Sequence, residues 1–438
     1  MHRRVLIVGT VPYNRQMTSR AFDAYFHNWE RENLRQIFSH PRTPVRGHCG
    51  ELYQITDKML LRRRLFRKEP IGRIYHYDEL EKDAVFGGDA DSSSFISKLY
   101  KLGSRKSPLN YLLRGWLWRK KYWSNDRLNS WMDEFQPECV FLAFSDDFFI
   151  PRIALYAAER YNIPIVSCIG DDYYFNDRFS LSPFYHLYRR RYKKLINKVF
   201  SHGGSAAYIG DKIRDKYNAE FHLRGETVYL VSEVERQPFR PIRTEYPKIV
   251  YCGNIRLGRD QSLADISRAL REIEPSYSLT VYSNENDKKY YRLLQESPGI
   301  DYKGTVPYEQ VKKELTDCDI TVVVEGFDKK DVDITRYSLS TKVADSLASG
   351  RFVLGYGSIE CGAIEYLRKI ECGLTCCSVD ELRRELPVIL ESVELQKKAY
   401  DRTTRISEAH HSLKRSTSVF EGIVETALSD YEDKYAER

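Results

Sequence analysis

The sequence predicts an α/β protein with two tandem Rossmann-like domains, and three observations support this. Short apolar runs without polar alternation recur along the chain, which is typical of strands buried in parallel sheets. Helical stretches separate these runs in a regular strand–helix order. A polar stretch punctuated by prolines, residues 238–247, interrupts this order, which then starts again. The length of 438 residues fits two or three domains.

The first domain is predicted over residues 1–240 and opens with a strand. Val5 to Val8 is a continuous apolar run, and a loop follows it. Apolar side chains at helical spacing then predict a helix over residues 18–38. This strand–loop–helix order is typical of the beginning of a Rossmann-like domain.

The alternation of strands and helices recurs later in this domain. A strand, a helix and a strand are predicted at residues 139–144, 150–161 and 164–169. Each strand is followed by a pair of carboxylates, Asp146 with Asp147 and Asp171 with Asp172. Ligands of open α/β sheets lie beyond the carboxyl ends of the strands. These side chains are therefore candidates for a binding site.

The second domain is predicted over residues 248–404, where the alternation restarts. Its predicted strands are residues 249–252, 279–282, 300–304, 320–324 and 351–354. Its predicted helices are residues 263–273, 308–318 and 342–349. The chain from residue 379 to about residue 428 is also predicted to be helical, and residues 405–438 form a separate C-terminal helical segment.

Composition limits the class of protein. Hydrophobic residues make up 42% and charged residues 30%, which excludes a disordered chain, and no window approaches the ~18 apolar residues of a transmembrane helix. The nine cysteines are scattered without a CxxC pair, so we expect no disulfide scaffold, no structural zinc and a cytoplasmic location. The net charge of +7 comes without a nucleic-acid motif, so we expect no nucleic-acid partner.

The strongest local feature is the segment from Ser338 to Gly350, which lies between two predicted strands. Ser340 or Thr341 is a good N-cap, and Gly350 is a good helix stop. A helix that begins at the carboxyl edge of a sheet offers free N–H groups to an anion, and the ammonium of Lys342 adds a donor for a diphosphate. The alternative interpretation is an ordinary capped surface helix.

This segment resembles the donor-site helix of GT-B glycosyltransferases, especially those of family 4 and the group 1 type, in the version S-T-K-x-x-[E/D]-x-L-A-S-G. The resemblance implies two Rossmann-like domains with a cleft between them and a last helix that crosses back to the N-terminal domain. It also implies that Asp345 contacts a ribose and that Ser340 and Thr341 hold a nucleotide diphosphate. The family's first acidic position falls on Tyr337, and Glu325 lies upstream at the end of a predicted strand. The donor-binding residues predicted here are Ser338, Ser340, Thr341, Lys342, Asp345 and Glu325.

A second match lies at the start of this domain, where residues 251–259 resemble the family's G-R-L-x-x-x-K-G loop. Gly253 and Asn254 occupy its first positions, and Arg259 falls on the family's lysine. The resemblance implies that Arg259, with Arg256, neutralises the leaving diphosphate. Transfer of a sugar expels a nucleoside diphosphate, whose growing charge needs fixed cations. The alternative is a solvated basic loop.

The resemblance implies that the N-terminal domain holds the acceptor. Asp172 is the predicted catalytic carboxylate: it would act as general base in an inverting reaction, or orient the acceptor hydroxyl in a retaining one. The other residues predicted on the acceptor side are Gly9, Thr10, Asp146 and Asp171. Adjacent aspartates also commonly cap turns, which is the alternative interpretation.

Two stretches, residues 58–68 and 105–123, mix basic side chains with large apolar ones. This composition is typical of segments that lie on anionic lipid, and equally of core-facing helices with a solvated basic face. Contact with the inner face of a membrane is one prediction for these two stretches.

Together, these features predict a glycosyltransferase that moves a sugar from a nucleotide-diphosphate sugar to a hydroxyl of a glycan or lipid-linked acceptor, in the biosynthesis of cell-surface polysaccharide or glycolipid. We expect no cofactor and no metal, because the cations would hold the diphosphate. Two alternatives stay open: a glycan-binding or scaffolding protein on a degenerate transferase fold, and a nucleotide-sugar epimerase.

Overall fold

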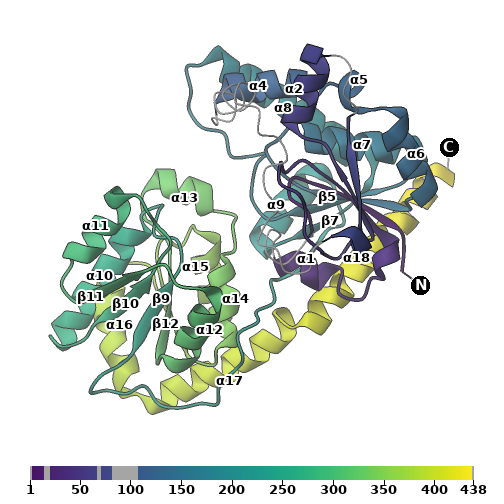
Figure 1. Cartoon of the computed structure of the whole chain (residues 1–438). Helices are drawn as coiled ribbons and strands as arrows, with labels where there is room; N and C mark the ends of the chain where they lie inside the picture. The colour runs from purple at the N-terminus through teal and green to yellow at the C-terminus, as the bar shows by residue number, and fades with distance from the viewer. Residues whose placement is uncertain (1, 14–19, 67–70, 81–106, 437–438) are drawn as a thin grey trace. The chain divides into compact units, whose positions relative to one another are not determined.

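The computed structural model describes residues 2–13, 20–66, 71–80 and 107–436, and the chain divides into two compact units. Unit 1 comprises residues 1–227 together with residues 417–438, and unit 2 comprises residues 228–416. Each unit is an α/β structure built on one sheet (Figure 1).

The sheet of unit 1 has the strand order β4-β3-β2-β1-β5-β6-β7-β8 among the described residues. Its strands are β1 (Val5–Gly9), β2 (Leu34–Phe38), β3 (Glu51–Gln54), β4 (Arg73–His76), β5 (Cys139–Ala143), β6 (Ile165–Ile169), β7 (Gly204–Tyr208) and β8 (Glu226–Thr227). All neighbours pair in parallel except β3 and β4. β1 is buried along its whole length, as an apolar run in a parallel sheet should be.

The helices of unit 1 are α1 (Arg20–Tyr25), α2 (Asp57–Phe66), α4 (Pro108–Leu117), α5 (Lys120–Trp123), α6 (Asp126–Phe135), α7 (Phe149–Tyr161), α8 (Pro183–His202) and α9 (Asp211–Phe221). The described part of unit 1 also contains two short 3-10 turns, Arg31–Asn33 and Tyr77–Glu79. The long helix α18 (Leu413–Ala436) belongs to unit 1 from Thr417 onward.

One predicted element is wrong. The helix expected over residues 18–38 ends at Tyr25 in its described part, and residues 34–38 form strand β2. β2 lies between β1 and β3 and is paired in parallel with both, so its backbone groups are satisfied by the sheet. This tertiary pairing overrides the helical spacing of the side chains.

Unit 2 contains a wholly parallel sheet with the order β11-β10-β9-β12-β13-β14. Its strands are β9 (Ile249–Cys252), β10 (Leu279–Tyr282), β11 (Ile300–Gly304), β12 (Ile320–Val324), β13 (Phe352–Tyr356) and β14 (Leu374–Cys376). Its helices are α10 (Arg259–Ile273), α11 (Lys288–Glu296), α12 (Tyr308–Asp317), α13 (Lys329–Thr335), α14 (Thr341–Ala348), α15 (Gly362–Ile370), α16 (Val379–Glu391) and α17 (Val393–His410).

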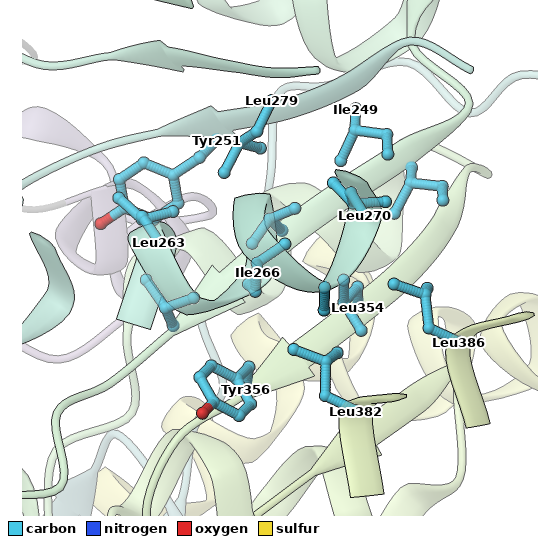
Figure 2. Packing of buried hydrophobic residues seen from close by; sticks show 14 of the residues in the cluster. Ile249, Tyr251, Leu263, Ile266, Leu270, Leu279, Leu354, Tyr356, Leu382 and Leu386 are labelled. Atoms are coloured by element: carbon cyan, nitrogen blue, oxygen red, sulfur yellow. The ribbon is translucent and has the colours of Figure 1, made fainter. Parts of the chain in front are cut away.

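The core of unit 2 lies between the sheet and the helices α10 and α16. Figure 2 shows Leu263 and Ile266 of α10 in this cluster, with Leu354 of β13 and Leu382 of α16. These four side chains are 0% exposed. The doubly wound fold expected for the second domain is therefore present, and its loops at the carboxyl edge of the sheet are held by a close-packed core.

Candidate functional site

The predicted donor residues meet at the carboxyl edge of the sheet in unit 2. The loop after β9 approaches the start of α14 so closely that a Cβ on Gly253 would lie 2.7 Å from Cδ of Lys342. Gly253 also has φ +154°, which only glycine adopts readily. Likewise, a Cβ on Gly326 would lie 2.3 Å from the carbonyl oxygen of Leu257. Gly253 therefore lets the loop after β9 approach α14, and Gly326 lets the loop after β12 approach the loop after β9.

Lys342 is a cation without a carboxylate partner among the residues that the structure describes. It is the second residue of α14, and its Nζ lies 5.6 Å from the centre of the Tyr251 ring. Burial, followed by the positive charge of Arg259, lowers the pKa of Lys342 from 10.5 to about 8. An anion bound here would therefore offset the electrostatic cost of burying the Lys342 ammonium.

Arg259, the first residue of α10, is paired with Glu325. Its Nε and Nη2 donate to Oε2 of Glu325 over 2.9 and 2.7 Å, and the Glu325 residue is 2% exposed. Burial opposes the charge of Arg259, but Glu325 outweighs it, so the pKa of Arg259 is raised. Ser262 of α10 donates to the carbonyl oxygen of Glu325 over 2.8 Å. The pair and this hydrogen bond fix the start of α10 against the end of β12.

Arg256 and Asn254 lie further along the loop after β9. Arg256 is an exposed residue whose Nε donates to Oε2 of Glu285 over 2.5 Å, and this interaction lowers the pKa of Glu285 to about 2. Asn254 closes the turn, because its Oδ1 accepts from the backbone N–H of Arg256 over 2.7 Å. The two residues line a shallow polar pocket of about 510 Å³. Arg256 is therefore more exposed than Arg259, whose side chain is 11% exposed.

The remaining donor residues surround the start of α14. Ser340 is the N-cap residue, but its side chain makes no capping hydrogen bond, and Thr341 is exposed. Ser338 lies in the loop before the helix and is partly buried. Asp345 is 7% exposed, and its Oδ1 accepts from Oγ of Ser232 over 2.6 Å. The chain segment that contains Ser232 is thus tied to α14, a contact that the sequence pattern did not reveal.

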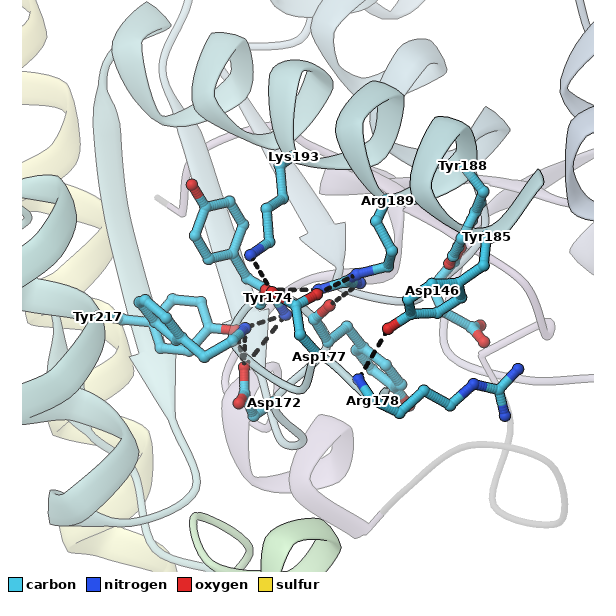
Figure 3. Close-up of polar contacts among 12 residues, drawn as sticks. Asp146, Asp172, Tyr174, Asp177, Arg178, Tyr185, Tyr188, Arg189, Lys193 and Tyr217 are labelled. Carbon is cyan, nitrogen blue, oxygen red and sulfur yellow. Dashed lines mark hydrogen bonds and ion pairs between the residues drawn. The ribbon is translucent and has the colours of Figure 1, made fainter. Parts of the chain in front are cut away.

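In unit 1, Asp172 follows β6 in a loop that α8 and α9 hold in place (Figure 3). Its Oδ1 accepts from the backbone N–H of Phe175 and from the hydroxyl of Tyr217, each over 2.8 Å. Arg189 of α8 holds the same loop through Asp177, over 2.6 Å. Among the described residues no group donates to Oδ2 of Asp172. The carboxylate therefore caps its own turn with one oxygen and keeps the other available.

The other acceptor-side residues have separate environments. Oδ2 of Asp146 accepts from the hydroxyl of Tyr111 over 2.7 Å, whereas Asp171 is exposed. Gly9 ends β1, and a Cβ there would lie 3.2 Å from Cβ of Ala143 in β5. The carbonyl oxygen of Thr10 accepts from the backbone N–H of His40 over 2.8 Å. Thr10 thus links the loop after β1 to the chain after β2.

Sequence reasoning missed the partners that position these groups. Arg189 and Tyr217 lie on helices that we did not predict, and the pairing of Arg259 with Glu325 joins residues 66 positions apart. The isolated acidic residue at the end of β12 is the single sequence signal for that pair. Within the described residues, no group of three or more His, Cys, Asp or Glu side chains is arranged to hold a metal ion.

No protein-family model and no curated protein matches the sequence. Solved structures do match. HepE from Anabaena in complex with UDP has 11% sequence identity and a TM-score of 0.55, covering 97% of this chain and 100% of its own. A glycosyltransferase from Rickettsia africae has 11% identity and a TM-score of 0.54, covering 99% of both chains. The lipopolysaccharide outer core galactosyltransferase WaaB has 11% identity and a TM-score of 0.50, covering 96% of this chain and 99% of its own. The chain therefore has the GT-B fold that the resemblance implied, and its assignment to family 4 stays a prediction.

Proposed function

We propose that this chain is a glycosyltransferase that moves a sugar from a nucleotide-diphosphate sugar to a hydroxyl acceptor. The observation that carries the proposal is the partly buried Lys342 at the start of a helix, beside Arg259 and at the carboxyl edge of a parallel sheet, with no carboxylate paired to it in the described part of the chain. A cation whose pKa is lowered by burial is costly to keep in a fold that binds no anion. A helix N-terminus at this edge of a sheet is a common place for phosphate groups.

The chemistry of transfer explains these groups. When the bond between the anomeric carbon and the diphosphate oxygen breaks, negative charge develops on the diphosphate. Lys342 and Arg259 would stabilise that charge without rearranging, because Gly253 packs against Lys342 and Glu325 holds Arg259. Ser338, Ser340 and Thr341 would donate further hydrogen bonds, with Asn254 and Arg256 at the rim. Asp345 would contact the ribose.

The acceptor is proposed to bind unit 1 next to Asp172. The oxygen Oδ1 is engaged by the loop, which fixes the direction of the carboxylate. The other oxygen, Oδ2, is then placed to accept a hydrogen bond from an acceptor hydroxyl, either to orient it or to remove its proton. Asp146 and Asp171 are proposed as further acceptor contacts.

A uridine nucleotide is the first donor to test. HepE was crystallised in complex with UDP and, in another structure, with UDP-glucose, and it shares the fold with this chain. WaaB is a lipopolysaccharide galactosyltransferase of the same fold, which favours a polysaccharide or glycolipid acceptor. We propose that neither a metal nor a cofactor takes part.

The test is binding of UDP, GDP, ADP and CMP to the whole chain, measured by thermal shift and calorimetry. We expect one nucleoside diphosphate to bind, and saturation at 100 times Kd to stabilise the protein by about 2.7 kcal/mol. The variant Lys342→Met should lose this binding. Lys330→Met, which removes an exposed lysine of α13 in the same unit, should retain it.

Turnover separates the proposed activity from its alternatives. A transferase releases the nucleoside diphosphate from its nucleotide-sugar when a suitable sugar acceptor is present, and Asp172→Asn should slow that step more than it weakens donor binding. An epimerase would interconvert the sugar and release no diphosphate. A scaffold would bind none of the nucleotides, a result that would refute the donor site.

A further inference from the structure

A second pocket, which the proposed transfer reaction does not use, lies in unit 1 among α4, α5, α7 and α8. Its volume is about 440 Å³, within the range of ligand pockets. Four basic residues line it, Arg119, Lys120, Arg152 and Arg191, and no acidic residue does so. Trp116 and other apolar side chains complete the wall. The pocket therefore combines a strong positive charge with an apolar surface.

The four cations are not neutralised within the part of the chain that the structure describes. None of them forms an ion pair there, although Arg152 donates to the carbonyl oxygen of Gly115 over 2.7 Å. Burial, followed by the charges of Arg191 and Arg119, lowers the pKa of Arg152. The cations thus repel one another across the pocket. An anionic group bound among them would reduce that repulsion.

Two stripes of exposed apolar side chains lead to this pocket. On α4, Leu109 and Leu113 are 44% and 52% exposed and lie seven and three positions before the pocket residue Trp116, on one face of the helix. On α8, Phe184 and Leu187 are 47% and 40% exposed and lie seven and four positions before Arg191. The two helices pack on each other, with Tyr111 stacked on Tyr188 at 4.8 Å.

The chain leading into α8 carries further exposed apolar side chains. Phe179 and Leu181 are 91% and 88% exposed, among the most exposed large apolar side chains of the described residues. Groups of large exposed apolar side chains commonly mark a surface that contacts another molecule. Figure 1 shows α4, α2 and α8 together at one end of unit 1.

Only part of the two basic stretches predicted to contact a membrane lies at this pocket and its apolar stripes. In residues 58–68 and 105–123, the side chains of Lys58, Trp118 and Trp123 are buried and belong to the core of unit 1. Residues 67, 68, 105 and 106 lie outside the described residues. No helix among the described residues has the length and apolar character needed to span a bilayer.

We propose that this pocket binds the phosphate group of an anionic lipid, whose hydrocarbon chains lie along the apolar stripes of α4 and α8. Arginine and lysine match phosphate through charge-assisted hydrogen bonds, and an apolar stripe beside the cations matches the acyl region. A free phosphate would use the four cations and leave the stripes without a role. A protein partner would need carboxylates at the centre of its apolar contact, where interfaces are depleted of charge.

The test is co-sedimentation of the whole chain with vesicles of phosphatidylcholine alone and of equimolar phosphatidylcholine and phosphatidylglycerol. We expect binding to the anionic vesicles only. The triple variant Arg119→Gln, Lys120→Gln and Arg191→Gln should bind them more weakly by on the order of a hundredfold, at about fivefold per charge near an anionic surface. These three residues are exposed, so we expect the melting temperature to stay close to that of the unchanged protein.

A matched control removes the same charge elsewhere in unit 1. Arg73→Gln, Lys216→Gln and Arg224→Gln replace three exposed cations outside the pocket and should leave vesicle binding unchanged. An equal loss in both triple variants would show diffuse attraction and overturn the pocket assignment.

A second variant tests the hydrocarbon contact and the source of the phosphate. Leu113→Ser combined with Leu187→Ser keeps every cation and should still abolish vesicle binding. Inorganic diphosphate should compete only weakly. If it instead binds the unchanged protein tightly, is lost in the pocket triple variant, and vesicles do not bind, the site takes a free anion and the lipid proposal is wrong.

Discussion

At the scale of single residues, Lys342 and Arg259 show two ways of keeping a cation beside an anion site. The guanidinium of Arg259 is planar and permanently charged, and Glu325 offsets the cost of burying it. The ammonium of Lys342 has no such partner among the described residues, and its pKa is lowered to about 8. The arginine supplies constant charge, whereas the lysine supplies charge that an anion must stabilise.

Replacing a lysine that stabilises the fold lowers the free energy of unfolding, whereas replacing a lysine kept for a ligand raises it. Lys342→Met should raise the free energy of unfolding at pH 7 by about 1–3 kcal/mol, because it removes a partly buried ammonium. The variant is expected to be more stable because the pKa of Lys342 is lower in the folded protein than in the unfolded chain, so the charged form destabilises the folded state. The penalty is fully present below pH 8 and disappears as the pH rises from about 8 to the unfolded value of 10.5. Urea unfolding at pH 7 and at higher pH measures this, and a destabilised variant at pH 7 would contradict it.

The same residue predicts a proton linkage in donor binding. A bound diphosphate raises the pKa of Lys342, so the free protein must take up a proton when it binds above pH 8. We therefore expect nucleoside diphosphate affinity to fall as the pH rises above 8 and to be flat just below it. Calorimetry in two buffers of different ionisation enthalpy measures the proton uptake. Without uptake at high pH, Lys342 does not contact the diphosphate.

At the scale of elements, the loops after β9 and β12 are set by close backbone approach. Gly326→Ala would place a methyl group 2.3 Å from the backbone oxygen of Leu257. A flexible side chain could move away from such a clash, but this backbone oxygen cannot move without shifting the loop. We expect a loss of stability of about 1–3 kcal/mol and weaker donor binding. Gly422→Ala is the control, because the exposed Gly422 of α18 has nothing within 4 Å of the added methyl. It should stabilise the helix by about 1 kcal/mol, as measured by thermal unfolding.

Elements with strong local patterns were predictable from the sequence, and elements defined by pairing were not. The strand β9 matches its predicted bounds, because a buried parallel strand is an apolar run with sharp ends. β2 was not predicted, because the spacing of Leu34 and Ile37 also fits a helix. Its pairing with the strands on both sides determines that this segment is a strand. The donor residues were found through a motif, whereas the hydrogen bond from Ser232 to Asp345 depends on contacts between residues 113 positions apart.

At the scale of the whole molecule, the chain leaves unit 1 after Thr227, builds unit 2 and returns to unit 1 at Thr417. Phe420 completes the core of unit 1: it is 0% exposed and contacts the rings of Tyr25, Phe26 and Phe141. Thr417 adds a hydrogen bond to the carbonyl oxygen of Ala24 over 2.8 Å. Unit 1 is therefore complete only when the last helix has formed, while the donor residues belong to a continuous segment of the chain.

This connectivity predicts that the two units respond separately to a core mutation and to a nucleotide. Phe420→Ala removes a buried ring and should cost unit 1 about 3–5 kcal/mol, which lowers its melting temperature by roughly 10 °C for a unit of this size. The donor residues, from Gly253 to Asp345, lie in unit 2, so UDP should raise the melting temperature of that unit equally in the variant and the unchanged protein. Differential scanning calorimetry with and without UDP resolves the two transitions. If the mutation shifts the UDP-sensitive transition as much as the other, the units unfold as one cooperative block, because stability lost in one would then be shared by both.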